Sequence, residues 1–277
     1  MSKKVMLVTG ASSGIGEACA VHFHNRDWRV YGASRNIQSA GSHPFAILPM
    51  DVTSDVSVAE GVRQIFEQEG RIDAVINSAG ISIVGAVEDT TIAEAKAQFE
   101  TNFFGIVRVC RAVLPIMRCQ RSGAFVIIGS MAGQLAIPFQ GHYTASKFAL
   151  EGLAEALRME VMPFGIHVVL MEPGNIRTPI TANRQRAAAS GTHPPYLEGF
   201  ERSLAVIEQA EINGADPALV ARQIERILAK PRSNLRYVVG HWSERFAVSL
   251  KRVLPYKLYE WLAMQIIGLG AWRQLAP

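Results

Sequence analysis

The chain has 277 residues, of which 49% are hydrophobic, and it carries a formal net charge of +4 at pH 7. This length and apolar content allow a large core, and they favour one elaborated α/β domain that spans residues 1–277. The basic residues are dispersed rather than gathered in a block with aromatic residues, so nucleic-acid binding is not expected.

The sequence contains neither a clear targeting segment nor a cysteine pattern that indicates disulfides or a metal. No apolar run reaches the roughly 18 residues of a membrane span, and Lys3-Lys4 with the apolar run that follows is too short for a signal sequence. Cys19, Cys110 and Cys119 are scattered and lack the spacing of metal ligands. We therefore expect a cytoplasmic protein with neither a disulfide framework nor a metal site.

Short apolar or β-branched runs alternate with longer helical patterns along most of the chain. This alternation predicts an α/β fold with a doubly wound parallel sheet of about seven strands and helices on both faces. The expected strands are residues 5–8, 29–33, 45–50, 74–76, 125–128, 167–171 and 237–239, and the expected helices are residues 15–26, 56–68, 92–117, 145–162 and 217–229. Pro115 should bend or end the third helix, and the connection 35–45 is short enough to predict a turn or an irregular loop.

Two segments depart from the alternation. Residues 180–213 have a polar, alanine-rich start and a break at His193-Pro194-Pro195-Tyr196, which is typical of a mobile insertion or lid over a substrate site. Residues 243–277 mix basic, aromatic and aliphatic residues and predict an amphipathic helical extension. This extension either makes peripheral contact with an anionic membrane surface or serves as a lid or packing helix.

The run Thr9–Gly16 follows the first apolar stretch directly and is typical of a loop that binds nucleotide phosphates. Gly10 would allow the tight turn, Gly14 would let the backbone approach a pyrophosphate, and Gly16 would let the next helix pack closely on the strand. The phosphates would then lie at the N-terminus of that helix. The sequence therefore predicts a dinucleotide site.

A second group of residues indicates the part of the same site that carries out the chemistry: Tyr143, Lys147 and Ser130. A tyrosine and a lysine four residues apart lie on one face of a helix, so the ammonium can act on the phenol. A tyrosine normally loses its proton near pH 10, and general acid/base work near neutrality needs the anion to be stabilised. Ser130 follows the strand 125–128, at the edge of the sheet where such folds bind ligands, and could hydrogen-bond a substrate oxygen.

The chain resembles the short-chain dehydrogenase/reductase family, in its single-domain subclass, at three motifs: Thr9–Gly16, Asn77-Ser78-Ala79-Gly80 and Tyr143 to Lys147. Ser78 is a mild departure, since the family usually has asparagine there. The resemblance implies a Rossmann fold and hydride transfer between a nicotinamide and a hydroxyl or carbonyl group.

The same resemblance assigns roles to individual residues. The catalytic tetrad would be Asn102, Ser130, Tyr143 and Lys147, in which Asn102 would hold a water that links Lys147 to solvent. Asp51 would face the adenine, although it could instead cap a local turn. The full set of expected cofactor-binding residues is Gly10, Ser12, Ser13, Gly14, Ile15, Gly16, Ser34, Arg35, Asp51, Val52, Asn77, Ala79, Gly80, Tyr143, Lys147, Pro173, Gly174, Ile176 and Thr178.

The second expected strand indicates which nicotinamide is used. An acid after this strand would bind the ribose 2′-hydroxyl of NAD and repel a 2′-phosphate. This chain has Ala33-Ser34-Arg35 there and no acid. Arg35 offers a planar guanidinium to a phosphate, and Ser34 or Ser12 a further donor, so NADP(H) is expected.

Residues 130–139 and 143–153 look most like the branch that contains 17β-hydroxysteroid and retinol dehydrogenases. The resemblance implies a hydrophobic carbonyl or alcohol as substrate; a steroid, a retinoid, a fatty-acid derivative and an aromatic ketone all fit. The pocket would be lined by Met131, Leu135, Ile137, Phe139 and the apolar C-terminal tail, or these residues would instead be core or dimer contacts. A homodimer or homotetramer through residues 92–117 and 145–162 is expected.

Two other functions compete with this interpretation. A sensor that binds NADP(H) without turnover would use the same fold, but it has no need of the paired Tyr143 and Lys147. An epimerase or dehydratase acting on sugar nucleotides would be longer, with a separate substrate domain. The sequence thus favours an NADP(H)-dependent oxidoreductase in which Tyr143 is the general acid/base.

Overall fold

The centre of the protein is one parallel sheet of seven strands in the order β3-β2-β1-β4-β6-β7-β9. A computed structural model describes residues 3–35, 43–230, 233–251, 253–270 and 272. The strands are β1 Val5–Thr9, β2 Arg29–Ser34, β3 Ala46–Pro49, β4 Ala74–Asn77, β6 Gly123–Ile128, β7 Ile166–Pro173 and β9 Arg236–Val239. The predicted sheet is therefore confirmed, with each expected strand at its predicted place. The predicted loop 35–45 falls largely on residues 36–42, which lie outside the described residues.

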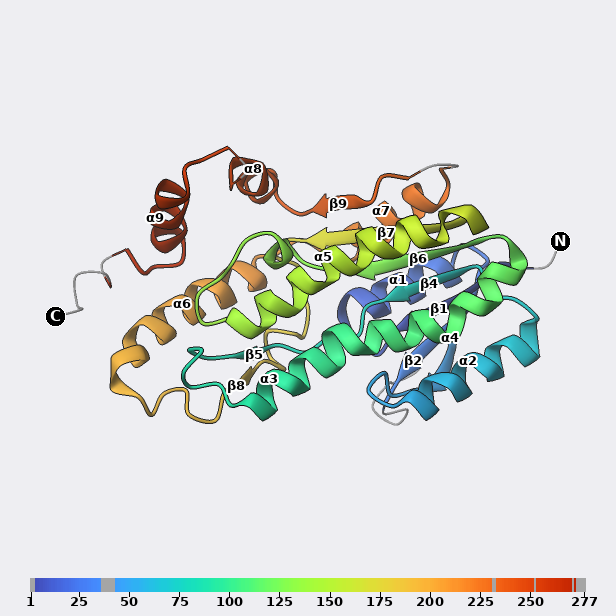
Figure 1. The fold of residues 1–277 in the computed structure, drawn as a ribbon, viewed down its shortest axis with the longest axis horizontal. Helices are drawn as coiled ribbons and strands as arrows, with labels where there is room; N and C mark the ends of the chain where they lie inside the picture. Colours follow the sequence, from blue (N-terminus) through green and yellow to red (C-terminus); the bar gives the residue numbers. More distant parts are fainter. Residues whose placement is uncertain (1–2, 36–42, 231–232, 252, 271, 273–277) are drawn as a thin grey trace.

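Helices cover both faces of this sheet (Figure 1). Val5 and Leu7 of β1 point into the core beneath α2, α4 and α5, whereas Met6 and Val8 point into the core beneath α1 and α7. Because both faces are buried, the strands are apolar throughout rather than alternating with polar residues. The helices are α1 Gly14–His24, α2 Asp55–Glu69, α4 Gly105–Gln120, α5 Gly141–Val161 and α7 Ala218–Leu228.

The long helix expected over 92–117 has three parts. It begins as α3 (Ile92–Phe99), passes through a π-helical turn at Glu100–Phe104, and continues as α4 to Gln120. Of the two effects expected for Pro115, ending the helix is wrong, since α4 runs five residues past it. Pro115 removes the hydrogen bond to the carbonyl of Arg111, but both residues are exposed, so water can replace that bond.

The segment 180–213 has more regular structure than its composition suggests. The His193-Pro194-Pro195-Tyr196 sequence does not break the chain, because it begins α6 (Pro194–Ile212). Proline is favoured in the first turn of a helix, where its missing N–H would have no partner anyway. Upstream of α6, β8 (Gln185–Arg186) pairs with β5 (Ile83–Val84) in a second, two-stranded sheet. The sequence analysis missed both of these strands and α6.

The C-terminal segment forms two helices rather than one, α8 (Trp242–Lys251) and α9 (Tyr256–Ile266), with Pro255 between them. With α6 they lie at the end of the molecule to which the strands of the sheet point (Figure 1). Within the described part of the chain, no helix combines the length and the apolar content that crossing a bilayer requires.

Candidate active site

The loop between β1 and α1 has the geometry that its glycines predict. Gly10 has a φ of +66°, and a Cβ there would lie 2.8 Å from the Cα of Ala79, so the backbone after β4 approaches too closely for a side chain. A Cβ on Gly16 would lie 2.2 Å from the carbonyl oxygen of Gly10. Gly16 therefore allows the first turn of α1 to pack directly on the loop.

The residues around this loop fit the phosphates of a dinucleotide. The first turn of α1 opens toward a cavity of about 950 Å³, and the side chain of its N-cap residue, Ser13, does not cap it. Uncapped N–H groups and the positive end of the helix dipole are what a pyrophosphate needs. Most of the expected cofactor residues line this cavity, namely Gly10, Ser12, Ser13, Gly14, Ile15, Ser34, Arg35, Asp51, Val52, Ala79, Gly80, Tyr143, Lys147, Pro173, Gly174, Ile176 and Thr178.

Three of the expected site residues lie behind the cavity wall: Gly16, Asn77 and Asn102. The Oδ1 of Asn102 accepts from the backbone N–H of Ile81 at 2.8 Å, and its Nδ2 donates to the carbonyl of Ile81 at 3.0 Å and to the Oγ of Ser146 at 3.2 Å. These contacts tie the π-helical turn to the segment after β4. The water relay assigned to Asn102 stays a prediction.

Asp51 caps a local turn and also lines the cavity, and its contact with the adenine stays a prediction. Its Oδ1 accepts from the backbone N–H and the hydroxyl of Thr53, at 2.9 and 2.8 Å, which is a turn-capping arrangement. Asp51 also lines the cavity at its β3 end. The turn cap therefore fixes the orientation of a carboxylate on the cavity wall.

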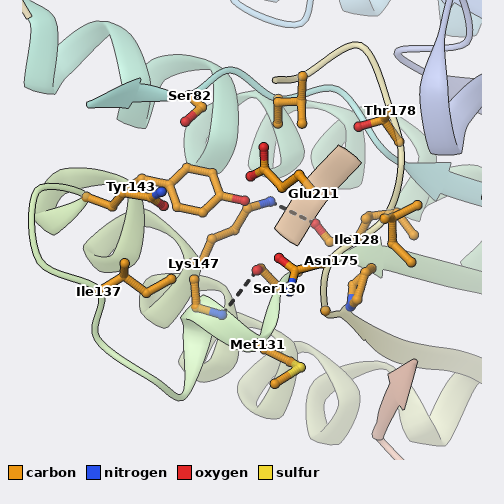
Figure 2. Close-up of a pocket in the computed structure, with 18 of the residues that line it drawn as sticks. Ser82, Ile128, Ser130, Met131, Ile137, Tyr143, Lys147, Asn175, Thr178 and Glu211 are labelled. Carbon is orange, nitrogen blue, oxygen red and sulfur yellow. Dashed lines mark hydrogen bonds between the residues drawn. The ribbon is translucent and has the colours of Figure 1, made fainter. Parts of the chain in front are cut away.

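Ser130, Tyr143 and Lys147 meet at the carboxyl end of β6 (Figure 2). Helix α5 begins at Gly141, four residues earlier than predicted, so Tyr143 lies in its first turn. The Oγ of Ser130 accepts from the backbone N–H of Ala132 at 3.1 Å, which orients the hydroxyl. The Nζ of Lys147 donates to the carbonyl of Ile128 at 3.0 Å and lies 5.7 Å from the centre of the Tyr143 ring.

Burial shifts the acidity of the two titratable groups in opposite senses. It raises the pKa of Tyr143 above its ordinary value of 10.0; the Ser130 hydroxyl opposes this rise, and the charge of Glu211 adds to it. Burial lowers the pKa of Lys147 to about 8. Tyr143 is thus protonated at neutral pH, whereas Lys147 loses its charge only slightly above neutrality.

The substrate end of the cavity extends from Tyr143 toward α6, α8 and α9. Met131, Leu135 and Ile137 line it as expected, but Phe139 does not. Phe139 has a φ of +62° and packs its ring against Phe200 of α6, so it belongs to a small separate core. The C-terminal tail lines the cavity as expected, and α6 adds apolar residues that were not expected. The residues of this lining are Val206, Ile207, Ala210, Phe246, Ala247, Leu250, Leu254, Tyr259, Leu262, Ala263, Ile266 and Ile267.

Two charged residues of this lining, Arg184 and Glu211, were missed by the sequence analysis. A signal for Glu211 was present, since Phe200, Leu204 and Ile207 share one face of α6 and Glu211 continues that spacing. A carboxylate at an inward position of a helix is rare unless it is paired, and it is therefore a candidate for a functional site. Because residues 180–213 were expected to form a mobile segment, this helical spacing was not used.

The model of the short chain dehydrogenase family matches residues 4–189 of this sequence. The chain belongs to the short-chain dehydrogenase/reductase family. A 3-ketodihydrosphingosine reductase of Bacteroides thetaiotaomicron is 41% identical over 261 residues, which cover 94% of this chain and 97% of that protein. Retinol dehydrogenase 8 of Bos taurus is 33% identical over 253 residues, which cover 84% of this chain and 80% of that protein.

A short-chain dehydrogenase from Streptomyces avermitilis has a solved structure with the same fold. Its TM-score is 0.82 at 33% identity, and the match covers 95% of this chain and 98% of that one. As a short-chain dehydrogenase/reductase, the protein is an oxidoreductase that acts on a CH–OH or carbonyl group with NAD(P)(H).

Proposed function

We propose that this enzyme uses NADPH to reduce the ketone of a long-chain, lipid-like substrate, and that a 3-keto sphingoid base such as 3-ketodihydrosphingosine is the best candidate. The observation that carries the proposal is the apolar extension of the cavity, which leads from Tyr143 between α6, α8 and α9. Walls of this kind favour an alkyl chain, since burial contributes on the order of 25 cal/mol per Å² of apolar surface. The 41% identical relative, a 3-ketodihydrosphingosine reductase, supports the same substrate.

Preference for NADP(H) rests on the end of β2. Ser34 and Arg35 line the cavity there, and the Arg35 side chain is exposed to solvent. A guanidinium can donate two parallel hydrogen bonds to the oxygens of a phosphate. The 2′-hydroxyl of NAD has a single oxygen and cannot accept such a pair. Ser12, on the glycine-rich loop, lines the same cavity and would add a further donor.

The side chains of the site fit the proton half of a ketone reduction. A bound reduced nicotinamide supplies the hydride. The Tyr143 hydroxyl, protonated at neutral pH because burial raises its pKa, donates its proton to the carbonyl oxygen. Ser130, whose Oγ is fixed by Ala132, hydrogen-bonds that oxygen as negative charge develops on it. Lys147, while charged, stabilises the phenolate that remains.

The test is NADPH oxidation, followed by absorbance, against a panel of 3-keto sphingoid bases, steroid ketones, retinal and small aromatic ketones. We expect turnover with the long-chain ketones and faster turnover with NADPH than with NADH. Turnover with steroids or retinal alone would refute the substrate proposal. Tight NADPH binding without turnover of any carbonyl would support the sensor instead.

We also propose that α8 and α9 rest on an anionic phospholipid surface, from which a lipid substrate would enter the cavity. Several large apolar side chains on these helices face solvent; Trp242 is 80% exposed and Trp261 is 49% exposed. Arg245 and Lys257 are exposed on the same two helices and would meet anionic headgroups. The apolar cavity lining of α9 is continuous with this surface.

Liposome flotation tests the membrane proposal. The wild type should float with vesicles of phosphatidylcholine and phosphatidylglycerol, and a Trp242→Ser/Trp261→Ser variant should remain in the lower fraction. Neither tryptophan lines the cavity, so the variant should still reduce a water-soluble ketone. Met159→Ser is a matched control, because Met159 is similarly exposed but lies on α5. Flotation of the double variant equal to wild type would contradict the proposal.

A further inference from the structure

Glu211 places a carboxylate in the substrate end of the cavity, across from the catalytic tyrosine. It lies near the end of α6, and its side chain is only 15% exposed. In Figure 2 the carboxylate lies beside the Tyr143 hydroxyl, in the same space that Ser130 borders. The two groups also interact electrostatically, since the charge of Glu211 contributes to the raised pKa of Tyr143. A substrate whose ketone meets Tyr143 therefore has its adjacent atoms close to Glu211.

The carboxylate is held in position but retains capacity for another donor. Thr181 Oγ1 donates to Oε2 of Glu211 at 2.6 Å, and Arg184 Nη2 donates to Oε1 at 2.5 Å. Each oxygen of an ionised carboxylate can accept about two hydrogen bonds, so each oxygen of Glu211 has room for one more. Glu211 is thus a preorganised acceptor on the cavity wall.

The charges around Glu211 favour a cation. Arg184 is 4% exposed, and two carboxylates face its guanidinium, Glu211 and, at 3.7 Å from Nη1, Glu208. This group carries one negative charge more than it carries positive charges. Lys147, the nearest catalytic cation, is directed to the carbonyl of Ile128. An ammonium on the substrate would neutralise the excess charge in a site shielded from water.

We propose that Glu211 binds a positively charged amino group on the carbon next to the substrate ketone, so that it selects α-amino ketones over neutral ketones. The inference rests on the proposed function and adds to it the residue that recognises the polar end of the lipid. In this arrangement the alkyl chain lies between α6, α8 and α9, the ketone meets Tyr143 and Ser130, and the ammonium donates to Glu211. Glu211 is a specificity residue, and it takes no part in the proton transfer.

The test compares two ketones that differ only in the amino group: 3-ketodihydrosphingosine and the analogue with hydrogen in place of the amine. Wild type should show a kcat/KM roughly 10- to 150-fold higher for the amino ketone, which is the range for a hydrogen bond to a charged group. Glu211→Gln keeps the size of the side chain but removes the charge. The amide oxygen can still accept from Arg184, and the amide N–H can donate to the Thr181 hydroxyl in place of the bond that this hydroxyl donates in wild type. In this variant the preference should fall to about twofold or less.

The ratio between the two ketones is the decisive readout. Glu211→Gln also removes a charge that raises the pKa of Tyr143, but this effect acts on both substrates and cancels in the ratio. Glu208→Gln is the matched control: Glu208 lies one helical turn earlier on α6 and faces the same arginine, but it does not line the cavity. Because Glu208→Gln also removes one of the two negative charges that face Arg184, its preference for the amino ketone should fall in part. It should stay well above the preference of Glu211→Gln, since the carboxylate on the cavity wall is still present.

The outcomes separate this inference from the proposed function. Reduction of both ketones by wild type at equal kcat/KM would refute the role of Glu211 while leaving ketone reduction intact. Retention of the preference in a folded Glu211→Gln variant would refute it as well. Failure of wild type to reduce either ketone would refute the proposed function itself. The comparison in wild type needs no variant, so equal kcat/KM values there would refute the inference even if Glu211→Gln does not fold.

Discussion

Arg35→Asp is the sharpest perturbation of cofactor choice that this structure offers. Arg35 follows β2 on the wall of the cavity, where the adenosine ribose of a dinucleotide would lie. The substitution removes the guanidinium that would bind a 2′-phosphate and introduces an acid that would repel it. The same acid can accept a hydrogen bond from the free 2′-hydroxyl of NADH. We therefore expect a large loss of NADPH affinity and little change in NADH affinity.

The expected magnitude follows from the exposure of Arg35. Two unit charges about 4 Å apart interact by about 1 kcal/mol in water and by about 4 kcal/mol at an effective dielectric of 20. Arg35 is exposed but lies at a cavity wall, so we take about 2 kcal/mol for the lost attraction and about 1 kcal/mol for the new repulsion. Together these changes raise the Kd for NADPH roughly 100- to 200-fold. The Kd for NADH should change by less than about threefold, because no phosphate contact is lost.

The assay is fluorescence titration of each cofactor without substrate, at low and at high salt. High salt should reduce the difference between wild type and variant, because exposed charges are screened. Arg29→Asp is the matched control, since Arg29 is an exposed arginine at the opposite end of the same strand. It makes the same change in net charge and should alter neither Kd by more than about twofold. Equal losses of NADPH and NADH affinity in Arg35→Asp would refute the reasoning.

Three further predictions follow from the buried titratable groups. Tyr143→Phe should lower kcat by roughly 10²- to 10⁴-fold with little change in the Kd for NADPH; a loss below tenfold would contradict a proton-transfer role. The kcat/KM for reduction should fall above pH 8, as Lys147, whose pKa burial lowers to about 8, loses its charge; a flat profile to pH 10 would contradict this. Burial raises the pKa of Glu172 from 4.5 to about 8, so between these values the folded chain holds a proton that the unfolded chain has released. The free energy of unfolding should therefore decrease from pH 5 to pH 8. Glu172→Gln should weaken that dependence in thermal melts while leaving the kcat/KM profile in place, and melts equal to wild type at both pH values would contradict it.

Local sequence patterns were sufficient where one short segment carries the whole requirement. The glycine loop is an example, since the turn at Gly10 and the close packing at Gly16 depend on the missing Cβ atoms of those residues. The spacing of Tyr143 and Lys147 is another, because four residues on any helix place two side chains on one face. The parallel sheet was predictable because strands buried on both faces must be apolar throughout.

Local patterns were misleading where the surroundings decide the outcome. The pair Pro194-Pro195 suits a loop or the first turn of a helix equally well, and the apolar residues that follow form α6 because the substrate cavity and a small core lie beneath them. Phe139 lies in an apolar run beside the expected pocket residues. Its positive φ and its contact with the ring of Phe200 direct its side chain into a small core instead of the cavity.

The sequence by itself determined the family, the doubly wound sheet and the meeting of Ser130, Tyr143 and Lys147 at the cavity, because backbone geometry and helix spacing fix these locally. Only the tertiary structure decided which side chains line the substrate end of the cavity. The Arg184 and Glu211 pair comes from two segments 27 residues apart, and the apolar walls come from α6, α8 and α9, which have no pattern that specifies where they dock. Substrate recognition depends on these long-range contacts, since the free energy of burial is gained only once distant segments have packed together.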